Sequence, residues 1–154
     1  MRRIPRVSDP PLGFLLTEAL IDRSGEAALI EILEALELHE IRMRGQVAKR
    51  TARQYGVGYR YEERAPVPGE PLPEWLASAG TATRRRWASW SAWSLASACR
   101  MRFRRGRGAE RVVFEMDLEP RSAYVLSGQA RWRWEHSIPP TPATRYSVTF
   151  RTLR

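Results

Sequence analysis

The chain is poor in cysteine and has no long apolar run. Cys99 is the only cysteine among 154 residues, so no disulfide can form within the chain, and a reducing cytoplasm is the expected location. No apolar stretch approaches the length of a membrane span, and the run from Leu12 to Leu16 is short, contains a glycine and does not make a signal peptide. We therefore expect one cytoplasmic domain, without membrane attachment and monomeric.

Lysine is almost absent, although the chain is strongly basic. Lys49 is the only lysine among 26 basic residues, which face 17 acidic ones and give a net charge of +9. Such an excess favours a polyanionic partner, because cationic side chains release the counterions condensed on nucleic acid. A chain rich in Arg, Ala and Pro is also typical of a GC-rich genome, whatever its function. DNA or RNA is therefore the expected partner, and the compositional explanation stays open.

Helical periodicity is clear in one place. Four apolar residues recur there at helical spacing: Leu29, Ile32, Leu33 and Leu36. The spacing predicts an amphipathic helix over residues 26–38, with Asp22 or Ser24 as its N-cap.

Most of the remaining chain alternates with a period of two, which indicates short strands. The segments with this pattern are 39–44, 55–61, 100–104, 112–118, 132–138 and 145–151, and two short apolar strands are expected at 14–16 and 123–126. A Pro-rich loop is expected over 65–73, residues 1–13 are expected to be a loose arm, and 77–93 shows neither period. The order of elements predicts a mainly β sandwich or jelly roll over 14–154, with the helix packed outside.

The last strand has two arginines on one face. Arg145 and Arg151 are six residues apart, which places their Cα atoms about 20 Å from each other. Extended side chains shorten this gap by about 6 Å from each end, which leaves room for a small dicarboxylate between two bidentate guanidinium groups. Ser147 and Thr149 lie between them and offer hydroxyl donors. The alternative interpretation is the polar outer face of an edge strand.

The chain has two histidines. His136 shares the strand face of Trp132 and Trp134, so it is a candidate metal ligand, with a core histidine as the alternative. His39 directly precedes Glu40 on a predicted strand and is expected to be structural or exposed.

Taken together, these residues resemble a known family. The pattern Trp134-x-His136-x-Ile138-Pro139, followed by Arg145-x-Ser147-x-Thr149-Phe150-Arg151, is similar to the C-terminal signature of the AlkB-like Fe(II)/2-oxoglutarate-dependent dioxygenases. Upstream segments resemble the same family in order, and nearly the whole chain is covered. These segments are Met43 to Gln46, Tyr55 to Tyr61, Pro71 to Leu76, Ser94 to Phe103 and Pro120 to Arg131.

The resemblance implies a double-stranded β-helix (jelly roll), with Fe(II) as cofactor and 2-oxoglutarate as cosubstrate. Members of the family oxidatively dealkylate nucleobases in DNA or RNA, as in DNA repair, and flip the target base into the pocket. By this resemblance His136 would be the distal iron ligand, Arg145 would hold the far carboxylate of 2-oxoglutarate, and Arg151 would lie near the metal. Three residues would belong to the substrate lid: Arg44, Gln46 and Tyr59.

The sequence departs from the family in its metal ligands. A facial triad needs two histidines and a carboxylate, and the His-x-Asp motif that supplies two of them does not occur in this chain. The Asn-x-Tyr segment of the family is absent too, and the span from Trp75 to Ser94 is a few dozen residues too short. The atypical segment 77–93 lies in this span, which suggests an internal deletion or frameshift that the nucleotide sequence would test.

Three interpretations therefore stand. The first is an AlkB-like oxygenase with an incomplete jelly roll, impaired or inactive because two metal ligands are missing. The second is a non-catalytic, basic nucleic-acid-binding domain, in which the aromatic residues of 55–61 stack on bases. The third is a small interaction domain, in which Arg145 and Arg151 contribute surface charge alone.

Overall fold

A computed structural model describes residues 5–43, 46–60, 65–77 and 90–151 of the chain. The chain divides into two compact units, one formed by residues 1–31 and 85–154 and the other by residues 32–84. Each unit is described by itself below. Within the described residues, no helix has the length and apolar character needed to cross a membrane.

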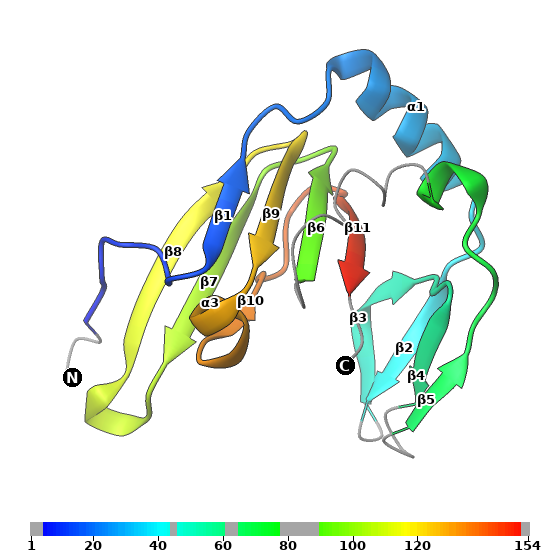
Figure 1. Ribbon diagram of the computed structural model, residues 1–154. Helices are drawn as coiled ribbons and strands as arrows, with labels where there is room; N and C mark the ends of the chain where they lie inside the picture. Colours follow the sequence, from blue (N-terminus) through cyan, green and yellow to red (C-terminus); the bar gives the residue numbers. More distant parts are fainter. Residues whose placement is uncertain (1–4, 44–45, 61–64, 78–89, 152–154) are drawn as a thin grey trace. The chain divides into compact units, whose positions relative to one another are not determined.

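Two antiparallel sheets make up the first unit (Figure 1). The larger sheet has four strands in the order β1 (Phe14–Thr17), β9 (Ser122–Leu126), β6 (Trp90–Leu95) and β11 (Tyr146–Arg151). The smaller sheet has three strands in the order β10 (Glu135–Ser137), β7 (Cys99–Arg105) and β8 (Val112–Leu118). Every pair of neighbouring strands is antiparallel. A mainly β, jelly-roll type of fold was the expectation, and it is confirmed.

The hydrophobic core lies between these two sheets. Phe14 of β1 and Phe103 of β7 meet edge to face, with ring centroids 5.2 Å apart, and Tyr124 of β9 is buried in the same cluster. Buried residues alternate with exposed ones along β7, as the pleat of a half-buried strand requires. The predicted alternation of Met101 and Phe103 with arginines is therefore confirmed.

The outer face of the smaller sheet is a set of cross-strand ion pairs. Arg100 bonds Asp117 at 2.6 Å, and these residues lie directly opposite each other on β7 and β8. The same register brings Arg102 to Glu115 at 2.5 Å and Arg104 to Glu135 at 2.6 Å. Opposite charges in this position stabilise a sheet. The positive charges of Arg100, Arg102 and Arg104 on this face are therefore neutralised by carboxylates.

Helix α1 spans Arg23–Glu34, so it begins three residues before the predicted start and ends four residues before the predicted end. Asp22 is its N-cap: the Asp22 Oδ1 accepts hydrogen bonds from the Gly25 amide at 2.7 Å and the Ser24 hydroxyl at 2.9 Å. These hydrogen bonds lower the pKa of the Asp22 carboxyl, that from Gly25 most. The helix therefore starts where its capping side chain is, upstream of the apolar stripe.

The N-terminal segment is hydrogen-bonded to the first unit. Arg6 forms a parallel bridge with Val113, and the carbonyl of Gly13 accepts from the Ser127 amide at 2.9 Å. Gly13 has φ +93°, and a Cβ at this position would lie 2.2 Å from the carbonyl oxygen of Ser127. Glycine is therefore required at the entry to β1. Residues 1–4 of the predicted loose arm lie outside the described part of the chain.

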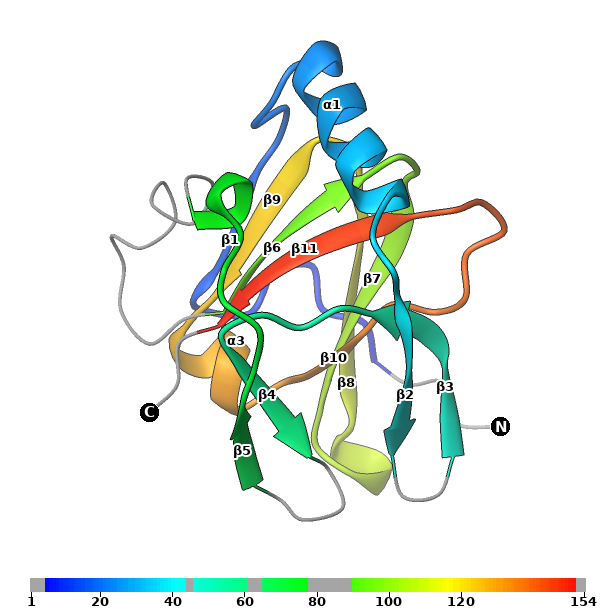
Figure 2. The same cartoon turned by 90° about the vertical axis from the view of Figure 1, so that its right-hand side faces the viewer.

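Two hairpins make up the second unit (Figure 2). The first pairs β2 (His39–Met43) with β3 (Gln46–Ala52), and the second pairs β4 (Val57–Arg60) with β5 (Ala65–Pro68). Arg53 bonds Glu70 through two nitrogens, with a shortest distance of 2.8 Å. Residues 74–77 form a short helix after Pro73. The loop predicted over 65–73 is wrong for 65–68, because prolines are compatible with an edge strand.

Two further predictions need correction. The predicted strand 132–138 is confined to β10, because a short helix, α3 (Gly128–Trp132), precedes it. Trp132 is consequently 52% exposed and does not share a face with His136. The segment 77–93 is regular at its end, since Trp90 begins β6, and residues 78–89 lie outside the described part. A 3-10 turn over Gly108–Glu110 (η1) connects β7 to β8.

Candidate functional site

The polar residues of β11 face the inside of the jelly roll. β11 pairs with β6 so that Ser147 lies opposite Ser94, Thr149 opposite Ala92 and Arg151 opposite Trp90. Ala92 belongs to the buried core cluster, and residues directly opposite each other in a sheet project from the same face. The predicted polar row of the last strand therefore lies on the core side. Ser147 and Thr149 are nevertheless exposed, because β11 is at the end of its sheet.

Arg145 begins this row, and its side chain is hydrogen-bonded to β6. Its Nε donates a hydrogen bond to the hydroxyl of Ser94 at 3.2 Å, and Ser94 is fully buried. One terminal nitrogen of Arg145, Nη2, is buried and has no hydrogen-bond partner among the described residues. A buried donor without an acceptor costs about 1–3 kcal/mol. The guanidinium group is therefore held in place with one donor left for an acceptor supplied from outside.

His136 is the middle residue of β10 and lies opposite Phe103 of β7. Its ring meets the indole of Trp90 edge to face, with ring centroids 4.5 Å apart and an interplanar angle of 77°. The histidine is only partly buried. The side chain therefore projects toward the aromatic end of the core, beside the start of β6.

The surroundings of His136 keep its imidazole neutral. Burial, followed by the positive charges of Arg131 and Arg151, lowers the pKa of His136 to about 4. A neutral imidazole is able to bind a metal ion. The two nearby guanidinium charges, however, repel any cation that approaches it.

The indole of Trp90 contacts the ring of His136 and the guanidinium groups of two arginines. The guanidinium carbon of Arg151 lies 4.1 Å from the centre of the Trp90 ring, and that of Arg131 lies 4.8 Å from it. These are cation–π distances. Burial lowers the pKa of Arg131, and the charge of Arg151 adds to this effect. The indole Nε1 of Trp90 is buried and has no hydrogen-bond partner in the described part of the chain.

The donor set around His136 does not fit a divalent metal ion. Within the described residues there is no group of three His, Cys, Asp or Glu side chains that could hold one. Glu135 is the neighbour of His136, but strand alternation places it on the other face, where it bonds Arg104 at 2.6 Å. Residues 78–89 contain no His, Cys, Asp or Glu, and the second histidine, His39, lies on β2 of the other unit. One imidazole near two guanidinium groups is a poor site for iron(II).

The predicted lid residues belong to the second unit. Gln46 begins β3 and is exposed, and Tyr59 lies in β4. Arg44 lies outside the described residues. Their assignment to a substrate lid stays a prediction. His39 is exposed on β2, as expected.

Sequence reasoning missed Trp90 and Arg131 as members of the site. Trp90 was assigned to an irregular segment, because the register that places it opposite Arg151 is a tertiary feature. Arg131 ends the segment Pro120 to Arg131, which had no site role in the resemblance, and it lies in α3. The usable signal was the spacing of Trp90 and Ser94, four residues apart, which places both on one face of a strand.

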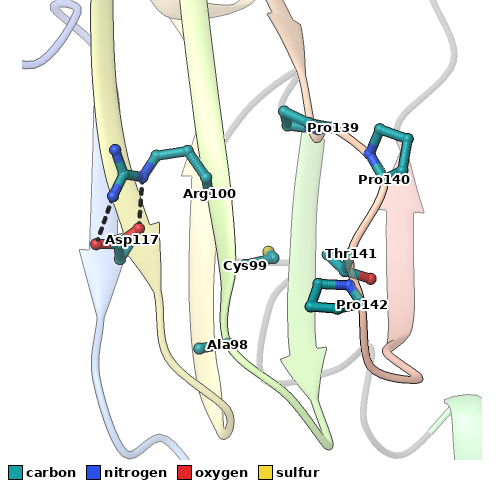
Figure 3. Close-up of a pocket in the computed structure, with 8 residues that line it drawn as sticks. All are labelled: Ala98, Cys99, Arg100, Asp117, Pro139, Pro140, Thr141 and Pro142. Carbon is teal, nitrogen blue, oxygen red and sulfur yellow. Dashed lines mark hydrogen bonds and ion pairs between the residues drawn. The ribbon is translucent and has the colours of Figure 1, made fainter.

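A pocket of about 260 Å³ lies elsewhere in the first unit (Figure 3). It is lined by the start of β7, including Cys99 and Arg100, by Asp117 of β8, and by prolines of the segment 139–142. Figure 3 shows that the charged groups in it, Arg100 and Asp117, are bonded to each other. This pocket therefore presents no unpaired charge to a ligand, in contrast to the row that contains Arg145.

Comparison with solved structures gives a fold match. The structure titled "The structure of OsALKBH1", an AlkB homologue, superposes with a TM-score of 0.61 over 94% of this chain and 100% of the matched chain, at 12% sequence identity. No family model and no curated protein matches the sequence. At this identity the likeness shows the fold alone, and the fold of this chain is AlkB-like.

Proposed function

We propose that this chain is an AlkB-like, 2-oxoglutarate-binding domain that acts on or binds nucleic acid and whose iron-dependent turnover is lost or severely impaired. The fold supports the type of domain. The inward row that begins at Arg145 supports the binding of an oxo-dicarboxylic acid. The chain therefore keeps the arginine that would bind the cosubstrate, but it lacks two of the three ligands that would bind the metal ion.

One observation carries the cosubstrate assignment. Arg145 is fixed by Ser94 and keeps a buried, unpartnered Nη2 within the described residues. A carboxylate is the acceptor that suits this group, because guanidinium–carboxylate hydrogen bonds are charge-assisted and directional. Ser147 and Thr149, which share its face, supply hydroxyl groups near the same ligand. An arginine that contributed surface charge alone would not bury a donor.

The test is binding of 2-oxoglutarate by isothermal titration calorimetry. Arg145→Ala should weaken binding about 10-fold to 100-fold, because it removes charge-assisted hydrogen bonds. Arg107→Ala is the matched control, since Arg107 is exposed beside η1 and its loss changes the net charge equally. Equal affinities for the two variants, measured with and without Mn(II), would show that Arg145 does not bind the cosubstrate and would overturn the proposal.

A basic nucleic-acid-binding domain without catalysis is the second candidate. Lys49 and Arg50 are both exposed on β3, whereas the arginines of β7 are paired with carboxylates. Binding of single-stranded DNA or RNA that weakens steeply with salt, is unaffected by a chelator and occurs without affinity for 2-oxoglutarate would favour this candidate. The aromatic contribution from 55–61 is described only for Tyr55, whose ring lies 5.8 Å from the guanidinium carbon of Arg53.

A further inference from the structure

Two positively charged side chains, Arg131 and Arg151, lie near His136. Arg131 from α3 and Arg151 from the end of β11 both lie against the indole of Trp90, at 4.8 Å and 4.1 Å from the ring centre. The same indole meets the ring of His136 at 4.5 Å. Both guanidinium groups therefore contact one indole, which also meets the imidazole, and Arg131 contacts the Trp132 ring as well, at 4.8 Å.

No carboxylate in the described part of the chain neutralises these two arginines. Among the described residues, neither Arg131 nor Arg151 forms an ion pair with Asp or Glu. The nearest acidic residue in sequence, Glu135, bonds Arg104 on the opposite face of its strand. Like charges held close together repel each other, and an anion bound between them removes that repulsion.

A third group points to the same kind of ligand. The indole Nε1 of Trp90 is buried and unpartnered within the described part of the chain. An indole nitrogen is a donor only and cannot bind a cation. Its missing partner is therefore an acceptor, and an oxyanion is also the kind of ligand that guanidinium groups bind.

We infer that the position beside His136, where the fold family would place a metal ion, is an oxyanion site in this chain, in which Arg131, Arg151 and the Trp90 indole N–H hold a carboxylate without any metal. This inference rests on the proposed function, because the carboxylate belongs to the dicarboxylate whose other end binds Arg145. The chain then binds 2-oxoglutarate through cationic side chains at both ends. A requirement for Arg131 distinguishes this metal-free binding from binding through a metal ion.

The main test is calorimetry with 2-oxoglutarate in excess EDTA. Binding should persist without metal, and Arg131→Ala should weaken it about 10-fold to 100-fold, because a charge-assisted contact is lost. Arg133→Ala is the matched control, since Arg133 is exposed at the end of the same short helix. Trp90→Phe keeps an aromatic ring, removes the N–H and should weaken binding about threefold to tenfold, which provides an independent test if Arg131→Ala does not fold.

Inorganic phosphate separates this inference from the proposed function. Phosphate needs the oxyanion site alone, so its binding should be lost in Arg131→Ala and retained in Arg145→Ala. If 2-oxoglutarate binds only when Mn(II) is present, the oxyanion site is wrong, and the assignment of Arg145 to the cosubstrate stands. If 2-oxoglutarate does not bind under either condition while phosphate binding depends on Arg131, the proposed function is wrong and the anion site stands. Wild-type affinity for both ligands in Arg131→Ala would overturn the inference.

Discussion

At the scale of single residues, His136 is the group whose ionisation the fold changes most clearly. Its ring is enclosed by Trp90 and Phe103, and two arginine charges act on it. Burial and like charge both favour the neutral form. The consequence for stability can be measured without any ligand.

We predict that the free energy of unfolding falls as the pH is lowered from 7 to 5. The pKa of His136 is about 4 in the folded chain and about 6.5 when unfolded, so between these values only the unfolded chain takes up the proton. The loss should be about 1–2 kcal/mol, reduced from the full value because the ring is partly exposed to solvent. Urea unfolding at the two pH values measures it.

The other histidine is the matched control for this prediction. His39→Asn should retain the pH dependence, because His39 is exposed, whereas His136→Asn should lose it. Carboxyl groups with lowered pKa, such as Glu115 next to Arg102, lose their stabilising contribution only at lower pH, as the carboxyl protonates. The pH 5–7 window therefore isolates histidine. An unchanged slope in His136→Asn would contradict the assigned environment.

At the scale of elements, the first turn of α1 is tied to two turns of the sheets through Glu26. Its carboxylate accepts hydrogen bonds from the Ala96 amide at 3.0 Å and from Arg121 at 3.1 Å. Ala96 and Arg121 both have positive φ, at 73° and 65°. Such conformations persist only where the surroundings hold them, and Glu26, which is 9% exposed, is part of those surroundings.

Glu26→Ala should therefore destabilise the chain by about 2–3 kcal/mol, because it leaves the Ala96 amide and the Arg121 charge without their acceptor. Glu31→Ala, an exposed position on the same helix, should change the stability by less than about 0.5 kcal/mol. Denaturant unfolding of both variants provides the comparison. Similar midpoints for the two would show that Glu26 does not anchor the helix.

At the scale of the whole molecule, the chain combines an AlkB-like fold with a histidine count of two. A facial triad that uses two histidines would require His39 of the second unit together with His136 of the first. The two arginines beside His136 oppose a cation there in addition. Fold likeness alone does not establish an activity, because activity depends on the residues of the site.

We predict that the chain does not convert 2-oxoglutarate to succinate in the presence of Fe(II), ascorbate, oxygen and an alkylated oligonucleotide. Succinate should stay at the level of a protein-free blank, while calorimetry on the same preparation shows that 2-oxoglutarate is bound. Calorimetric binding serves as the control that the protein is folded. Iron-dependent succinate formation well above the blank would prove this prediction wrong.

Several features of the fold and the site were predictable from the sequence because they depend on local periodicity. The alternation of Met101 and Phe103 with arginines predicted the half-buried strand β7, and it is confirmed. The same rule predicted one common face for Arg145, Ser147 and Arg151. Local patterns were misleading where a short helix interrupts a strand-like run, as at Trp132, because five helical residues leave little periodic signal.

The sequence by itself therefore determined the class of fold, the polar row on the last strand and the absence of a His-x-Asp motif, all of which follow from residue order. Only the tertiary structure decided which face of β11 points inward, because that depends on its register against β6. It also brought Trp90, from the start of β6, and Arg131, from α3, close to His136. Contacts between residues distant in sequence arise from sheet pairing, and no local pattern encodes the partner.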